Sequence, residues 1–99
     1  MVKRKLIWSH TAKIKLFEIL DYFRGRNNTS TYSQKLYTKI IREVSVLIKQ
    51  PEIGLKTYLN DVRCLIIENY MVFYETSETS IIIHTIWDSH QNPENLKIK

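Results

Sequence analysis

Apolar residues in the first half of the chain recur at helical spacings and form two separate stripes. The first stripe follows Ser9, which is typical of a helix N-cap because its hydroxyl can accept a hydrogen bond from a first-turn amide. Its members are Ala12, Leu16, Ile19, Leu20 and Phe23. These spacings place them on one side of an amphipathic helix. Gly25 and the polar residues 26–28 predict the end of this helix.

The second stripe predicts a helix that begins near residues 29–31, any of which can cap it, and ends before Pro51. Proline lacks an amide donor and disfavours helical backbone in the residue before it. The stripe consists of Leu36, Ile40, Val44, Leu47 and Ile48, with Tyr37 and Ile41 beside it. Because only a few residues separate the two predicted helices, we expect them to lie antiparallel as a helical hairpin.

At Leu55 the pattern changes from a helical to an extended period. Stretches rich in β-branched and aromatic residues predict three strands that pair as an antiparallel meander. These stretches are 62–67, 70–75 and 80–87, and residues 3–8 predict a further strand before the first helix. The sequence therefore predicts an α+β fold of order β-α-α-β-β-β. The helical hairpin should pack on one face of the sheet and leave the other face free to bind a partner.

Two short polar segments predict the turns of the meander. Glu68–Asn69 leaves room for a very tight turn, in which Asn69 is expected to tolerate a positive φ. Residues 76–79 form the second turn. The consecutive apolar residues 81–83 of the last strand point to both faces of the sheet in alternation, which indicates a central strand covered at least partly on both faces.

Composition indicates the number of domains, the net charge and the expected cellular compartment of the protein. The chain has 99 residues and 43% apolar residues, which fits one folded domain spanning 1–99. A net charge of +5 favours a partner with negative charge, such as nucleic acid or an acidic protein segment. The one cysteine, Cys64, can form no internal disulfide, no N-terminal signal is visible, and the apolar runs are too short to span a bilayer. We therefore expect a cytoplasmic protein without a membrane partner.

No pattern in the sequence indicates a metal or a cofactor. The three histidines have no ligand-like spacing relative to Cys64 or to a group of carboxylates. A glycine-rich phosphate loop and a supported Ser/His/Asp arrangement are also lacking. The sequence predicts no metal site and no small-molecule cofactor.

Four segments together resemble the RelE/ParE superfamily, the small toxins of bacterial type II toxin–antitoxin systems. They are LIWSHTAKIKLFEILDYF, the connector PEIG at 51–54, the hairpin VRCLIIENYMVFYE and the closing IWDSHQNP. The likeness spans almost the whole chain, although each motif alone is weak. It implies a growth-inhibiting toxin that a cognate antitoxin wraps and silences. It also implies one of two targets, DNA gyrase for a ParE-like toxin or ribosome-bound messenger RNA for a RelE-like one.

Met71 favours the ParE-like alternative. In the ribonuclease branch an arginine commonly stands at this place in the second meander strand, and a thioether cannot neutralise a phosphate. The RelE-like alternative implies a metal-independent endoribonuclease, in which Arg63 and Lys56 would stabilise charge and His90 or Tyr74 would transfer a proton. A decayed toxin that survives as a binding module is the third alternative.

Two residues of the meander have both a functional and a structural interpretation. Alternation places Arg63 with Leu65 and Ile67 on one face, where it could bind a phosphate or an antitoxin carboxylate on the open side of the sheet. Alternatively, Arg63 has a structural role and either pairs with a nearby acid such as Glu68 or covers a sheet edge. His84 alternates with residues 82, 86 and 88, and we interpret it as a satisfied, half-buried residue.

The closing loop carries the remaining candidates. His90 follows the last strand, where relatives often have a basic residue, and it could act as an acid or base or simply cap the strand end. Asp88 and Gln91 are expected to shape the loop through backbone hydrogen bonds. Tyr70 could stack on a nucleobase, whereas Tyr74 is expected to pack across strands. The predicted target- or antitoxin-binding residues are Arg63, Tyr70, Met71, Asp88, His90 and Gln91.

Overall fold

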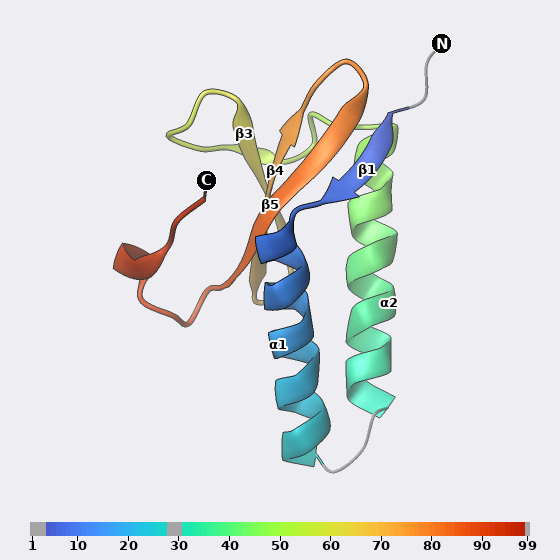
Figure 1. Ribbon diagram of the computed structural model, residues 1–99, viewed down its shortest axis with the longest axis vertical. Helices are drawn as coiled ribbons and strands as arrows, with labels where there is room; N and C mark the ends of the chain where they lie inside the picture. The colour runs from blue at the N-terminus through green and yellow to red at the C-terminus, as the bar shows by residue number, and fades with distance from the viewer. Residues whose placement is uncertain (1–3, 28–30, 99) are drawn as a thin grey trace.

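The computed structural model describes residues 4–27 and 31–98, and within them it has an α+β fold (Figure 1). The elements are β1 (Lys5–Trp8), α1 (His10–Asn27), α2 (Thr31–Ser45), the 3₁₀ helix η1 (Val46–Ile48), β2 (Leu55–Lys56), β3 (Val62–Ile67), β4 (Tyr70–Thr76), β5 (Ser80–Asp88) and the 3₁₀ helix η2 (Pro93–Asn95). The predicted order of strand, two helices and a three-stranded antiparallel meander is confirmed.

The sheet contains two strand pairings that the sequence pattern did not predict. Its strand order is β1-β5-β4-β3-β2. β1 runs parallel to β5, with Leu6 beside Ile81 and Trp8 beside Ile83. The two-residue strand β2 pairs antiparallel with β3 at the opposite edge. All three meander strands, β3, β4 and β5, are therefore interior, and the helical hairpin is the crossover that connects β1 to the rest of the sheet.

Ser9 caps α1 as predicted and also fastens it to the sheet. Its Oγ accepts a hydrogen bond from the Ala12 amide at 3.0 Å and donates one to the His84 carbonyl at 2.8 Å. The predicted end of the helix within residues 25–28 is confirmed, because α1 ends at Asn27, although Gly25 itself is still helical. Glycine in a helix costs about 1 kcal/mol relative to alanine but does not forbid helical backbone. The predicted caps at 29 and 30 lie outside the described residues.

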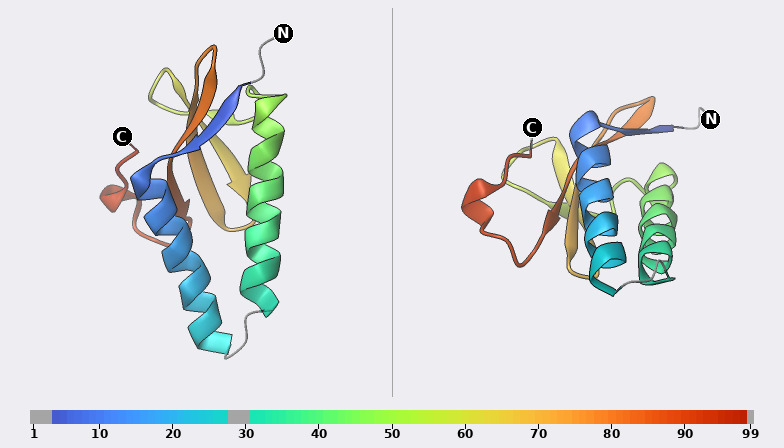
Figure 2. Two further views of the ribbon diagram at one scale, coloured as in Figure 1. Left: turned by 45° about the vertical axis from the view of Figure 1, so that its right-hand side comes forward. Right: turned by 60° about the horizontal axis from the view of Figure 1, so that its bottom comes forward.

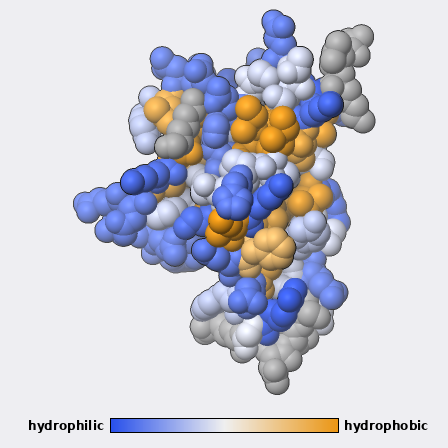
Figure 3. Space-filling model, viewed as in Figure 1, coloured by the Kyte–Doolittle hydropathy of each residue, from blue (hydrophilic) through white to orange (hydrophobic). Residues whose placement is uncertain are grey.

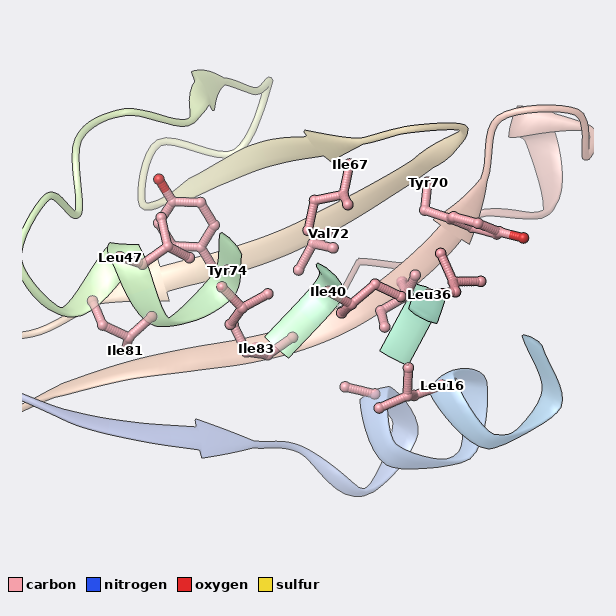
Figure 4. Close-up of a cluster of buried hydrophobic side chains, with 13 residues drawn as sticks. Leu16, Leu36, Ile40, Leu47, Ile67, Tyr70, Val72, Tyr74, Ile81 and Ile83 are labelled. Atoms are coloured by element: carbon pink, nitrogen blue, oxygen red, sulfur yellow. The ribbon is translucent and has the colours of Figure 1, made fainter. Parts of the chain in front are cut away.

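The helix-facing side of the sheet carries the larger hydrophobic core (Figure 4). The predicted stripe of α2 is buried at Leu36, Ile40 and Val44, and Leu47 of η1 continues it. From the sheet, the buried partners are Ile67, Tyr70, Val72, Tyr74, Ile81, Ile83 and Ile86. The periodicity of the sequence thus corresponds to a continuous apolar contact between the hairpin and the meander.

The other face of the sheet is not free, contrary to the prediction. The segment after β5 turns back along this face, on the side opposite the helices (Figure 2). It brings Leu96 and the buried Ile98 against Trp87 and Phe73, and these residues form a second core with Val62 and Cys64. The prediction failed because residues 96–98 are too short to show a periodic pattern. We refer to residues 89–98 as the C-terminal segment.

Two local features of the meander also differ from the prediction. Glu68, not Asn69, has the positive φ of the tight turn, at 54°. In β5 a bulge interrupts the alternation, because Phe73 pairs with Thr85 while Tyr74 pairs with Ile83. His84 is therefore an extra residue on β5. The predicted placement of residues 82, 84, 86 and 88 on one face is wrong for this reason.

Candidate functional site

The predicted site residues lie in two places at opposite ends of the sheet. Lys56 and Tyr74 are both register partners of Arg63, near the edge strand β2. Tyr70 pairs with Asp88 at the other end of β4, beside the loop that contains His90 and Gln91. The residues proposed for charge stabilisation are thus separated from His90 by the length of the strands.

Arg63 and Tyr74 hold the connector 51–54 against the sheet. The Arg63 Nη1 donates to the carbonyls of Glu52 and Gly54 at 3.2 and 2.9 Å. The Tyr74 hydroxyl donates to the Pro51 carbonyl at 2.7 Å and accepts from the Gly54 amide at 2.9 Å. We call these residues the connector clamp. Its four hydrogen bonds satisfy backbone groups that β2 and η1 leave unpaired.

The clamp changes the interpretation of Arg63. Alternation with Leu65 and Ile67 is confirmed, since both pack against the helix-facing core. Their shared face is therefore the one that the helical hairpin covers, and the expected position of Arg63 on an open face is wrong. The alternative pairing with Glu68 is not seen either, because Arg63 binds backbone carbonyls and Glu68 lies 4.0 Å from the Lys39 ammonium.

Tyr74 is fully buried, as the packing interpretation predicted. Burial raises the pKa of its phenol, while the Gly54 amide and the Arg63 charge oppose that rise. The hydroxyl is closely surrounded, because a β-carbon at Gly54 would come within 2.7 Å of the Tyr74 ring. A sealed, hydrogen-bonded phenol is poorly placed to exchange a proton with a substrate.

Lys56 is the exposed cation beside the clamp. Together with Arg4 and Arg63 it lines a depression of about 240 Å³, whose other walls include the acidic Glu52 and Asp61. The Arg4 Nε donates to the Ser77 carbonyl at 2.8 Å. Two of the three cations thus already bind main-chain oxygens, whereas within residues 4–27 and 31–98 the Lys56 ammonium has no hydrogen bond or ion pair.

Met71 lies on the second face of the sheet. It is half-buried, pairs with Trp87 across β4 and β5, and packs against the second core. Its surroundings are apolar side chains. The place where ribonucleases of this superfamily are expected to hold an arginine is therefore part of a hydrophobic cluster in this chain.

Asp88 organises the loop after β5, as expected. Its Oδ1 accepts from the His90 amide at 2.9 Å and lies 3.1 Å from the His90 Nδ1, while its carbonyl accepts from the Gln91 amide at 3.0 Å. The His90 ring is 74% exposed and lies at the tip of the loop. Its position is compatible both with capping the strand and with contact to a target.

His84 has the structural role that the sequence suggested. Its Nε2 lies 2.9 Å from the Glu75 Oε1, and both side chains are partly buried. Among residues 4–27 and 31–98, no group of three histidine, cysteine, aspartate or glutamate side chains could hold a metal ion. Within the same residues, no helix combines the length and the hydrophobicity needed to cross a membrane.

Sequence reasoning missed a cavity of about 380 Å³ between α1 and the end of β5. Three predicted residues, Tyr70, Asp88 and Gln91, line it. The other lining residues are Lys15, Glu18, Ile19, Tyr22, Phe23 and Ile86. Burial and then the Asp88 charge raise the pKa of Tyr70 to about 12. The residues of α1 repeat at three- and four-residue spacings beside the apolar stripe, which is the signal that could have identified them.

The outer side of the helical hairpin has an apolar groove. Phe17 is 73% exposed, and Tyr37 is also exposed. With Trp8, Leu20 and Ile41 they line a groove of about 230 Å³. Figure 3 shows hydrophobic atoms gathered over β1 and the adjoining parts of α1 and α2. Contiguous exposed apolar surface on a small protein is characteristic of a protein-binding face.

Comparisons with known proteins agree with this architecture. Residues 6–93 match the family described as the ParE toxin of the type II toxin–antitoxin system parDE. A chain of a chromosomal ParDE system from P. aeruginosa superposes with a TM-score of 0.75 at 20% identity, covering 87% of this chain and 96% of that one. A chain of the RelBE2 toxin–antitoxin complex from Mycobacterium tuberculosis gives 0.58 at 14% identity, covering 89% and 93%. No curated protein sequence matches the chain.

Proposed function

Since the chain belongs to the ParE toxin family of type II toxin–antitoxin systems, we propose that it inhibits growth by binding DNA gyrase or another macromolecular target and does not cleave RNA. One observation carries this proposal: the residues that could perform RNA cleavage do not converge on one place. Cleavage at a ribose 2′-hydroxyl needs a base, an acid and phosphate-binding cations around a single phosphate.

Each candidate for such a site has a different environment. Tyr74 is fully buried, and Arg63 donates to the connector carbonyls. Met71 packs within the second core. His90 lies at the opposite end of the sheet from Lys56, as the strand register indicates. Toxicity through binding needs no convergence of these residues, and it is therefore the activity that the arrangement supports best.

We propose further that a cognate antitoxin covers the apolar groove of the helical hairpin. Both solved structures named above are of toxin–antitoxin systems, and amphipathic segments commonly bind in grooves between helices. Lys13 lies in the wall of the groove, and Arg24 lines the adjoining depression. A segment that combines apolar anchors with acidic residues would complement this surface. The protein would then act and be silenced in the cytoplasm.

The RelE-like alternative rests on the depression beside the connector clamp. Arg4, Lys56 and Arg63 all line it, and three cations could hold a phosphate. For this alternative to hold, Arg63 would have to leave the carbonyls of Glu52 and Gly54, and a proton acceptor would have to come from the substrate or the ribosome.

The test is inducible expression of the toxin without its antitoxin. Plasmid supercoiling and messenger RNA ends are measured on the same culture, for the wild type and for the variants Lys56→Gln and His90→Asn. We expect growth arrest with intact messages, and equal toxicity of the Lys56→Gln variant. Loss of supercoiling would identify gyrase as the target, and unchanged supercoiling with arrest would point to another one.

Two outcomes would contradict the proposal. Codon-phased cleavage that disappears in the Lys56→Gln or His90→Asn variant would establish the RelE-like alternative. Unimpaired growth at verified expression of folded protein would favour a decayed toxin that serves as a binding module.

A further inference from the structure

The cavity between α1 and the end of β5 combines aromatic rings with carboxylates. Tyr22 and Phe23 of α1 line it together with Tyr70 of β4, and their neighbours in the wall include Glu18 and Asp88. The Tyr22 and Phe23 rings pack edge to face, with centroids 5.2 Å apart. Rings and acids in one cavity are the chemistry that binds an organic cation, because ring faces and carboxylates both attract positive charge.

The charge of this cavity is opposite to that of the protein. The chain has a net charge of +5, whereas the cavity is lined by two carboxylates and one ammonium group. The ammonium, Lys15 Nζ, also lies 5.8 Å from the centroid of the Trp87 ring, which attracts it. The elevated pKa of Tyr70 agrees with a negative potential here, since after burial the nearby Asp88 and Glu68 contribute to it.

Several polar groups of the cavity have no partner among the described residues. Glu18 forms no ion pair or hydrogen bond there. The Tyr70 side chain is 6% exposed, yet its hydroxyl has no hydrogen bond within residues 4–27 and 31–98 and points away from the core (Figure 4). Asp88 uses Oδ1 for the His90 contacts, and its second oxygen has no hydrogen-bond partner in the part of the chain that the structure describes. Acceptors are therefore present on both walls of the cavity.

We propose that this cavity receives the guanidinium group of an arginine side chain presented by a protein partner. A planar guanidinium can stack on a tyrosine ring and donate to carboxylates at the same time, which a compact ammonium cannot do. The volume of about 380 Å³ is ample for one side chain. The carboxylates would repel the phosphates of a nucleic acid, and the described residues offer no cluster that could hold a metal ion.

This site lies apart from the apolar groove of the helical hairpin, and it goes beyond the proposed function because it does not depend on which target the toxin has. Arginine is enriched among the residues that dominate protein interfaces, and it tends to pair with aromatic residues. On a basic toxin, an acidic aromatic cavity would select a partner by its cation at one point while the rest of the surface favours anionic groups.

The first experiment titrates the purified toxin chain with N-acetyl-arginine methylamide and follows backbone amide shifts by NMR. We expect perturbations at Tyr70, Asp88 and the 15–23 segment, with a dissociation constant on the order of 1 mM. The matching citrulline derivative has the same shape without the charge and should bind at least about tenfold more weakly. Equal binding of the citrulline derivative, or perturbations centred elsewhere, would overturn the proposal.

Two variants of α1 test the site, one expected to weaken binding of the arginine derivative and one expected to strengthen it. Glu18→Gln should weaken binding about tenfold, because it removes an unpaired carboxylate from an exposed position. Lys15→Met should strengthen binding several-fold, because it removes the competing ammonium. Glu78→Gln is the matched control, an exposed acid in the turn between β4 and β5, and should leave the dissociation constant unchanged.

Tighter binding of spermidine than of the arginine derivative would overturn the assignment to a protein side chain. Displacement of the derivative by a short RNA would do the same. All of these measurements use the isolated chain and no growth assay, so they can fail while the proposed function stands, and the proposed function can fail while they succeed.

Discussion

The two faces of the sheet are covered in different ways. On the helix-facing side, the described residues include thirteen buried members of one core, contributed by α1, α2, η1 and three strands. On the other side, five buried residues form the second core, and Ile98 of the C-terminal segment is the one from outside the sheet. Two connected helices cover the first face, whereas a short irregular segment covers the second.

The helical hairpin and the C-terminal segment also differ in the backbone hydrogen bonds that attach them to the sheet. Ser9 joins the start of α1 to the sheet through hydrogen bonds to the backbone of β5. Among the described residues, no backbone hydrogen bond joins residues 96–98 to the sheet. Residues 96–98 are therefore held there by apolar side chains, whereas the first residue of the C-terminal segment, Ser89, donates a backbone hydrogen bond to the Asn69 carbonyl in the turn between β3 and β4. A cover whose last residues have no backbone hydrogen bonds to the sheet and few buried contacts opens locally at a lower free energy than the global unfolding of the domain.

The largest effect is expected from a truncation in the helix-facing core. Ile83→Ala removes a fully buried side chain between α2 and the sheet, where rigid neighbours cannot close the cavity. The free energy of unfolding should fall by about 3–4 kcal/mol. Urea denaturation followed by circular dichroism measures this loss. A loss below about 1.5 kcal/mol would mean that the helical cover is as adaptable as the C-terminal segment.

The connector clamp predicts the next largest effect, on the same side of the sheet. Tyr74→Phe leaves the Pro51 carbonyl and the Gly54 amide without their partner. The free energy of unfolding should fall by about 2 kcal/mol, because these two backbone groups are removed from water in the folded chain and would lose the hydrogen bonds that offset this cost. Tyr58→Phe is the control, since Tyr58 is exposed and should show no change in the same urea series. Equal stability of both variants would exclude a structural role of the clamp.

On the second face, Ile98→Ala should lower the free energy of unfolding by about 1 kcal/mol only, because the segment can move into the vacated space. The variant should also expose Cys64, which the second core buries. Labelling of this thiol by a disulfide reagent should become about fivefold faster without denaturant, since about 1 kcal/mol corresponds to a factor of about five. Unchanged labelling would show that the segment does not open separately.

The smallest effect concerns alkaline pH. The folded chain has Tyr70 with a pKa of about 12, raised from 10.0 by burial and by Asp88. The unfolded chain ionises this phenol near pH 10, so the stability that depends on its neutral form is complete below pH 10 and is lost as the pH rises toward 12. Tyr70→Phe should therefore reduce the fall of the urea midpoint between pH 8 and pH 11. An identical fall in the variant would contradict this assignment.

Features with a local cause could be predicted from the sequence. The stripes of α1 and α2, the cap at Ser9 and the strands of the meander depend on periods and residues close together in the chain. The parallel pairing of β1 with β5, the bulge at His84 and the covering of the second face depend on contacts between distant residues. Alternation correctly grouped Arg63 with Leu65 and Ile67, but only the packing of the hairpin decides which face they share.

The same distinction applies to the candidate site. Asp88 was expected to shape its loop, because the residues that it binds follow immediately in sequence. The cavity beside it was missed, since Glu18 and Tyr22 reach it from a helix whose position the sequence does not specify. Predicted site residues that lie far apart in the chain, such as Lys56 and His90, could not be recognised as distant in space.

The closeness of Gly54 to the Tyr74 ring has a consequence for how the family varies. Any side chain at position 54 would overlap the phenol, although the backbone there does not need a glycine for its φ. Homologues should therefore change the two positions together: a larger residue at 54 should accompany a smaller one at 74, and a tyrosine at 74 should accompany glycine. An alignment in which these two columns vary independently would mean that the connector takes another path in those relatives.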